Sequence, residues 1–143
     1  MKEIPIVYWS GGGNTAQMSI AIETGINNAG AKGKRIRVQD TTAKEIAKYD
    51  AVAFGCPAMG TEQLEGNYFE PFFREMEQYL DGKRVILFGS YGWGGSYMKE
   101  WNKRVTIAGG ILVDRGFLAE NEPDQDALDY CKKMGKALVE ASK

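Results

Sequence analysis

Histidine is absent from the 143-residue sequence, and cysteine occurs only at Cys56 and Cys131. These absences exclude a Ser-His-Asp triad, a Cys-His catalytic pair, a haem iron bound by histidine and the usual zinc sites. Two thiols that lie far apart in the sequence also exclude a disulfide scaffold and fit a reducing compartment. We therefore expect a cytoplasmic protein. No base is visible beside Cys56, so both thiols are expected to be small buried groups.

Long apolar runs and a strong net charge are missing as well. The longest apolar stretches fall far short of the ~20 residues that a membrane span needs, and the first residues show no signal-peptide pattern. The formal net charge of −1 argues against a broad nucleic-acid-binding surface. The sequence therefore predicts neither a membrane partner nor a nucleic-acid partner.

Short apolar runs alternate with segments of helical periodicity along the chain, which suits one domain over residues 1–143. Strands are expected at residues 4–9, 35–39, 51–56, 84–89 and 111–114, with helices between them and a last helix that starts near Pro123. This alternation predicts a doubly wound α/β fold with a five-stranded parallel sheet, order 2-1-3-4-5, and helices on both faces. The ligand crevice of such a fold lies beyond the carboxyl ends of the first and third strands.

The first strand ends in the segment Ser10-Gly11-Gly12-Gly13-Asn14-Thr15, which leads directly into a helix. Free backbone N–H groups and the positive end of the helix dipole favour an anion such as phosphate there. A tight turn with Asn14 or Thr15 as the N-cap is the structural alternative. The segment has no lysine, which excludes a Walker A site. It also fits a loose dinucleotide pattern with Asp40 at a ribose, but the chain is short for that architecture.

The loops after the third and fourth strands carry side chains suited to a planar ring. Met59 follows the third strand and Trp93 the fourth, so a ring could lie between a thioether and an indole. Glycines flank Trp93 and remove the neighbours that would pack it, although it could instead cover the end of the sheet. Trp101, by contrast, recurs at helical spacing and is expected in the core, as are Phe69, Phe72 and Phe73.

Three segments resemble the short-chain flavodoxins, the one-domain FMN electron carriers of bacteria. They are residues 8–15 (Tyr-Trp-Ser-Gly-Gly-Gly-Asn-Thr), 55–60 (Gly-Cys-Pro-Ala-Met-Gly) with the acids up to 65, and 88–94 (Phe-Gly-Ser-Tyr-Gly-Trp-Gly). They occur in the order of the family, and the similarity runs over nearly the whole chain. The resemblance implies a flavodoxin-like fold and non-covalently bound FMN, with its phosphate at the first segment and its isoalloxazine ring at the other two.

The resemblance also implies which residues contact FMN. Met59 would face one side of the ring and Trp93 the other. The peptide at Gly60 would turn over on one-electron reduction, so that its carbonyl accepts a hydrogen bond from flavin N5–H, a motion that glycine tolerates. Glu62 would accept from flavin N3–H or line the ring edge. The implied set is Ser10, Gly11, Gly12, Gly13, Asn14, Thr15, Pro57, Ala58, Met59, Gly60, Thr61, Glu62, Ser90, Tyr91, Gly92 and Trp93.

The function implied is that of a low-potential one-electron carrier, cycling between semiquinone and hydroquinone, without substrate turnover of its own. The three loops have no Lys or Arg to offset the phosphate and the anionic reduced flavin, so the last electron should be hard to add. Gly12 departs from the family, which has a threonine there. One hydroxyl hydrogen bond to phosphate, worth roughly 1.5–3 kcal/mol at most, is therefore missing.

Charge along the chain suggests how partners dock. Six acids face one base, Arg74, between residues 62 and 81: Glu62, Glu65, Glu70, Glu75, Glu77 and Asp81. We expect a monomer whose acidic flavin edge docks redox proteins, namely flavin or iron-sulfur reductases and acceptors. The basic residues between Lys32 and Lys48 are expected to form a solvated surface.

Other functions on this type of fold remain open. An FMN enzyme, such as a quinone or nitro reductase, would need a substrate pocket and usually a dimer or a longer loop, for which 143 residues leave little room. The flavodoxin-like accessory protein of ribonucleotide reductase, a partner module without catalysis, has different loops. A receiver domain is disfavoured, because Ser10-Gly11 and Cys56 stand where its acidic residues would be.

Overall fold

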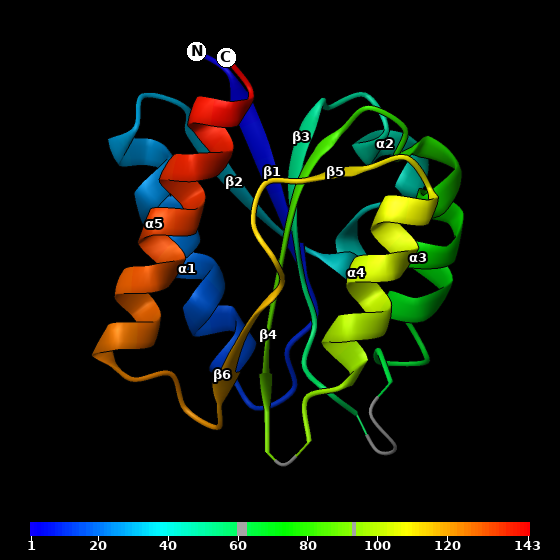
Figure 1. Ribbon diagram of the computed structural model, residues 1–143, viewed down its shortest axis with the longest axis vertical. Coiled ribbons are helices and arrows are strands. Elements are labelled where there is room, and N and C mark those ends of the chain that lie inside the picture. The colour runs from blue at the N-terminus through cyan, green and yellow to red at the C-terminus, as the bar shows by residue number, and fades with distance from the viewer. Residues whose placement is uncertain (60–62, 93) are drawn as a thin grey trace.

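The computed structural model describes residues 1–59, 63–92 and 94–143. Its centre is a parallel sheet in the order β2-β1-β3-β4-β5, in which β6 also pairs with β4 (Figure 1). The predicted fold class and strand order are confirmed. The strands are β1 (Glu3–Tyr8), β2 (Lys32–Arg37), β3 (Ala51–Gly55), β4 (Arg84–Tyr91), β5 (Ile111–Leu112) and β6 (Phe117–Glu120).

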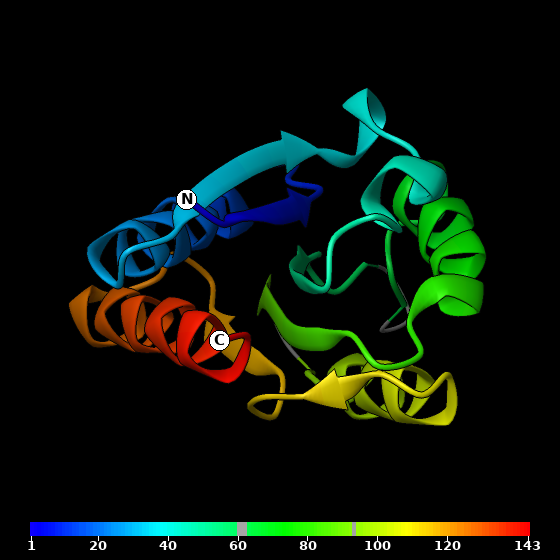
Figure 2. The same ribbon diagram turned by 90° about the horizontal axis from the view of Figure 1, so that it is seen from above.

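Helices cover both faces of the sheet, as Figure 2 shows from above. One layer consists of α1 (Asn14–Asn28) and α5 (Gln125–Ala141), and the other of α2 (Ala43–Ile46), α3 (Phe69–Met76) and α4 (Tyr97–Ile107). Short 3₁₀ turns follow β2 at Val38–Asp40 and α3 at Glu77–Tyr79. In the described ranges, no helix is long and apolar enough to cross a membrane.

The side chains of the sheet alternate between the two helix layers. Phe54 of β3 packs in the cluster with α3 and α4, whereas Ala53 packs in the cluster with α1 and α5. Every residue of β3 is buried, as expected of a central strand. Trp101 is also buried, and it meets the rings of Phe69 and Phe73 edge-on at centroid distances of 5.5 and 5.6 Å. The predicted core position of these aromatic residues is confirmed.

The fifth strand is broken into two pieces, which differs from the prediction. The strand expected at residues 111–114 is only β5, and the sequence pattern gives no indication of β6. Val85 pairs with Leu112 and Phe88 with Phe117, so four residues, 113–116, stand opposite two of β4. Gly116 lies in this bulge, where a Cβ would collide with Met98 of α4. Beyond the bulge, β6 continues to the carboxyl edge of the sheet.

Candidate functional site

Three loops meet at the carboxyl ends of β1, β3 and β4. The first strand ends at Tyr8, one residue earlier than predicted, but the Trp9 N–H still donates to the Gly55 carbonyl at 3.0 Å. The Ala58 N–H donates to the Ser90 carbonyl, also at 3.0 Å. The loops after β1, β3 and β4 are therefore connected by backbone hydrogen bonds at one edge of the sheet, as the predicted topology requires.

The glycine-rich loop between β1 and α1 is organised by Ser10. Its Oγ accepts hydrogen bonds from the N–H groups of Gly13 and Ala16, both at 3.2 Å. Gly13 occupies the N-cap position with φ 94°, a left-handed conformation that favours glycine, and it makes no side-chain cap bond. The alternative in which Asn14 or Thr15 caps this helix is therefore wrong.

Space and donors in this loop suit a phosphate. Helix geometry leaves the N–H groups of Asn14 and Thr15 without partners inside α1, and the positive end of the helix dipole lies at the same point. Gly11 and Gly12 are exposed. A Cβ added at Gly12 would have no heavy atom within 4 Å, so this side of the loop is open. The residues present therefore fit an FMN phosphate.

Thr15 connects the glycine-rich loop to the loop after β4. Its side chain is almost completely buried, with 1% exposed. Thr15 Oγ1 lies 3.1 Å from Ser90 Oγ and also accepts from the Ser90 N–H at 3.4 Å. The resemblance places both residues at the cofactor, and the contact between their hydroxyl groups also joins the two loops to which they belong.

The loop after β3 carries Met59. Met59 and Gln63 form an antiparallel bridge with N–H···O distances of 2.9 and 3.1 Å. Met59 is 37% exposed, so its thioether is accessible to a flavin ring at this surface. Pro57 and Ala58 are half-buried. Gly60, Thr61 and Glu62 lie outside the described residues.

The loop after β4 is anchored to β6. The Asn121 N–H donates to the Tyr91 carbonyl at 2.7 Å, and β6 pairs with β4 up to Tyr91 and Glu120. Tyr91 is half-buried and Gly92 is exposed, so both reach the surface at this edge. Trp93, expected on the second face of the ring, lies outside the described residues.

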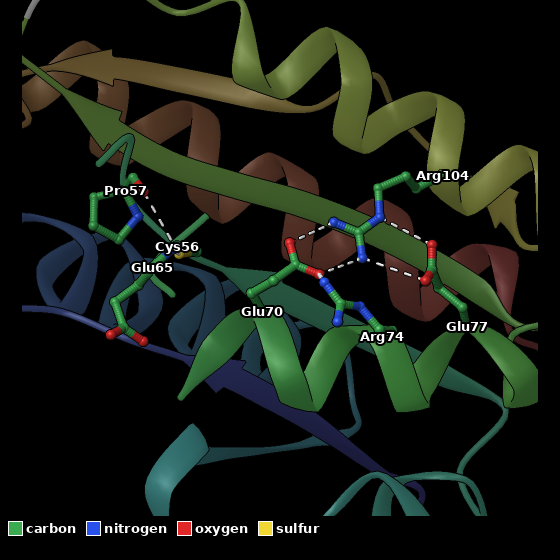
Figure 3. A network of polar contacts seen from close by, with 7 residues as sticks. All are labelled: Cys56, Pro57, Glu65, Glu70, Arg74, Glu77 and Arg104. Carbon is green, nitrogen blue, oxygen red and sulfur yellow. Dashed lines mark hydrogen bonds and ion pairs between the residues drawn. The ribbon is translucent and has the colours of Figure 1, made fainter. Parts of the chain in front are cut away.

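Two residues that close the base of the loop after β3 were not expected in this role. Cys56 Sγ accepts from the Glu65 N–H at 3.3 Å, and the Glu65 carboxylate accepts from the N–H groups of Asn67, Tyr68 and Phe69 at 2.8–2.9 Å. Glu65 thereby occupies the N-terminus of α3, as its place in Figure 3 indicates. Burial raises the pKa of the Cys56 thiol, which therefore stays neutral; the expected buried position of both thiols is confirmed.

Arg104 of α4 bonds to one acid of α3 and to one of the 3₁₀ turn that follows it (Figure 3). Its guanidinium donates to both oxygens of Glu70 at 2.8 Å and to both oxygens of Glu77 at 2.9 and 3.3 Å. Burial disfavours the charge, but the two carboxylates raise the pKa of Arg104 above its ordinary value. With Glu65 at the helix N-terminus, three acids of the expected acidic stretch thus accept hydrogen bonds within the chain: Glu65 is buried, whereas Glu70 and Glu77 are partly exposed.

Comparisons with known proteins agree with this geometry. The family model "Flavodoxin" matches residues 6–135. A flavodoxin of Megasphaera elsdenii is 42% identical over 96% of this chain and 99% of its own, and one of Clostridium beijerinckii is 42% identical over 90% and 96%. The solution structure of two-electron reduced M. elsdenii flavodoxin superposes with a TM-score of 0.86, covering 96% of this chain and 98% of that one.

A family match over most of the length and relatives at this level of identity assign both fold and function. The curated relatives are electron carriers and not enzymes with a substrate of their own. The chain therefore belongs to the flavodoxin family and is an electron-transfer protein that binds FMN.

Proposed function

We propose that FMN lies across the carboxyl edge of the sheet, with its phosphate in the loop of residues 10–15. The ring would lie between the loop of residues 57–62 and that of residues 90–93. The connection of all three loops, through Trp9 to Gly55, Ala58 to Ser90 and Thr15 to Ser90, carries this assignment. Gly60, Thr61, Glu62 and Trp93 belong to it by their place in the loops.

The bound flavin supplies the one-electron chemistry, and the chain sets its environment. Backbone N–H groups of the glycine-rich loop hold the phosphate, while Met59 covers one side of the ring. The described parts of the three loops contain no Lys or Arg, so no side-chain cation there stabilises a negative charge on the ring. This arrangement supports a carrier that accepts its last electron only at low potential.

The protein is proposed to act as one domain of residues 1–143 and as a monomer in the cytoplasm. One sheet takes its strands from residues 3 to 120, and α5 packs against α1 beside it, which supports a single folding unit. Cys56 and Cys131 are both unpaired and buried, as suits a reducing compartment.

Partners are proposed to dock at the same edge, on acids that differ from those expected. Glu65, Glu70 and Glu77 already accept hydrogen bonds within the chain, and Glu62 is outside the described residues. Glu75 is exposed in the last turn of α3, and Asp81 lies shortly before β4, at the opposite edge. A second group runs from the end of β6, where Glu120 pairs with Tyr91, into the first turns of α5, and no basic residue interrupts it between 117 and 131. Its members are Glu120, Glu122, Asp124, Asp126 and Asp129, all exposed. This group fits basic redox proteins.

Gly12→Thr tests the phosphate loop. The open space at Gly12 accommodates the larger side chain, and its hydroxyl gains a charge-assisted hydrogen bond to phosphate. We expect the dissociation constant of FMN to fall about tenfold, as roughly 1.5 kcal/mol implies. Fluorescence titration of the apoprotein measures it. Gly12→Ala adds the methyl without the hydroxyl and should leave affinity within about twofold. Equal affinity of Gly12→Thr and Gly12→Ala would refute a phosphate at this loop.

Ionic strength tests the docking surface. Electron transfer from the reduced protein to a basic cytochrome c should slow about tenfold between low and high salt, because salt screens attraction between opposite charges. The double variant Glu120→Gln, Glu122→Gln should be slower at low salt and less sensitive to it, as stopped-flow measurement would show. A control at the opposite edge, Glu3→Gln with Asp81→Asn, changes net charge equally and should match the parent. If both double variants behave alike, net charge and not this surface governs docking.

A further inference from the structure

Tyr97 links the ends of the two loops assigned to the flavin ring. It is the first residue of α4 and directly follows the loop after β4. Its hydroxyl donates to the Cys56 carbonyl at 2.7 Å, in a buried position. Cys56 in turn is the residue at which the chain leaves β3 for the loop that carries Met59. One side-chain hydrogen bond thus joins the exit of one loop to the entrance of the other.

The backbone at Gly89 is shaped around this bond. A Cβ at Gly89 would collide with both the Cys56 carbonyl oxygen and the Tyr97 hydroxyl. The three groups therefore fill a gap between β3 and β4 that is too small for any side chain at position 89. A displacement of the Tyr97 hydroxyl would be transmitted to the backbone of both strands just before their loops begin.

The Tyr97 ring is fixed by packing against other aromatic side chains. Its ring stacks on Trp101 at 6.3 Å with an interplanar angle of 26°, and Trp101 is wedged edge-on against Phe69 of α3. Farther along α4, Arg104 is bonded to four carboxylate oxygens of Glu70 and Glu77. Helix α4 is thereby fixed on α3, so the position of the Tyr97 hydroxyl is set by packing.

We propose that the Tyr97 hydroxyl is a positioning group that sets the spacing of the two ring loops, and through it the affinity for FMN and the potential of its second electron. It acts through the Cys56 carbonyl and does not touch the flavin. The inference rests on the proposed assignment of the loops to the ring. Burial raises the pKa of Tyr97, so its hydroxyl remains a donor throughout the neutral pH range.

The variant Tyr97→Phe tests this, because it keeps the ring stacking and removes only the donor. We expect the dissociation constant of FMN to rise about fivefold, the loss that one net hydrogen bond implies. The potential of the second electron should become less negative, because loosened loops admit water beside the anionic reduced ring. Gly89→Ala pushes the same hydroxyl away from Cys56 and should give the same two changes. Tyr68→Phe, at an exposed tyrosine, is the control.

Equilibrium titration of apoprotein with FMN and anaerobic potentiometry of the loaded protein provide the readouts. Unchanged affinity and potentials in both Tyr97→Phe and Gly89→Ala would overturn the proposal. A lowered melting temperature with unchanged potentials would also overturn it, because Tyr97 would then contribute to stability alone. Met59→Ala distinguishes a failure of the loop assignment from a failure of the role proposed for Tyr97. If it also leaves FMN binding unchanged, the assignment of the ring loops fails; if it weakens binding while Tyr97→Phe does not, only the role of Tyr97 fails.

Discussion

Replacing Gly25 with alanine is expected to lower the free energy of unfolding by about 3 kcal/mol. Gly25 lies where α1 crosses α5, and an added Cβ would collide with the Lys132 carbonyl oxygen and lie 2.8 Å from its carbon. Gly135 of α5 meets α1 in the same way, at the Ile22 carbonyl and 3.0 Å from the Ile26 nitrogen. The obstacle is backbone on both sides, so no side-chain rotation relieves it and the helices must separate.

Urea denaturation of the apoprotein, followed by circular dichroism, measures the effect of Gly25→Ala. Gly66→Ala is the matched control, because a Cβ there would have no heavy atom within 4 Å. Its stability should stay within about 0.5 kcal/mol of the parent. A loss below about 1 kcal/mol in Gly25→Ala would mean that the helices separate easily and that this crossing is not tightly packed.

The packing at this helix crossing also affects the cofactor site. Helix α1 begins at the glycine-rich loop and contains Gly25 in its last turns, so a shift of its axis moves the N–H groups proposed for the phosphate. FMN affinity of Gly25→Ala should therefore fall together with stability. Packing at the other end of α1 is thus part of what positions the phosphate loop.

The sequence predicts well those features that depend on periodicity and parallel topology. The continuous apolar run of β3 indicates a central strand, and the carboxyl ends of parallel strands must share an edge, which brings the loops after β1, β3 and β4 together. Just past the end of α1, Gly30 has φ 94°, the left-handed conformation that commonly ends a helix and favours glycine.

Features that depend on long-range contacts could not be predicted. Asp114-Arg115-Gly116 has the composition of a turn, so nothing in the pattern shows that the chain rejoins β4 as β6. Ser10 caps a helix that begins four residues later, beyond the usual spacing of a cap. Arg104 is separated from Glu70 by 34 residues, and only the packing of α4 on α3 shows that the pair forms. Part of the acidic stretch is therefore used in contacts within the fold.

The expected consequence of Glu65→Gln shows how such a buried acid differs from a surface acid. The carboxylate is 4% exposed and accepts three backbone N–H groups at the start of α3. The amide has one acceptor oxygen, and its NH₂ group faces donors. At least one buried N–H group then loses its partner along with the charge, so we expect a loss of about 3 kcal/mol in stability. Chemical denaturation measures it, with Glu75→Gln, an exposed acid on the same helix, as the control.

Glu65→Gln should also weaken FMN binding, because Glu65 holds the end of the loop that begins at Cys56. Its N–H group donates to Cys56 Sγ and its carboxylate fixes α3, so the loop of residues 57–64 is closed at its base by one residue. Without this anchor to α3, the loop would sample more conformations, and FMN binding would have to restrict them. We therefore expect the dissociation constant of FMN to rise about tenfold. If Glu65→Gln loses stability but keeps full affinity, the loop is ordered by the flavin itself. Its anchor to α3 then serves the fold and not the site.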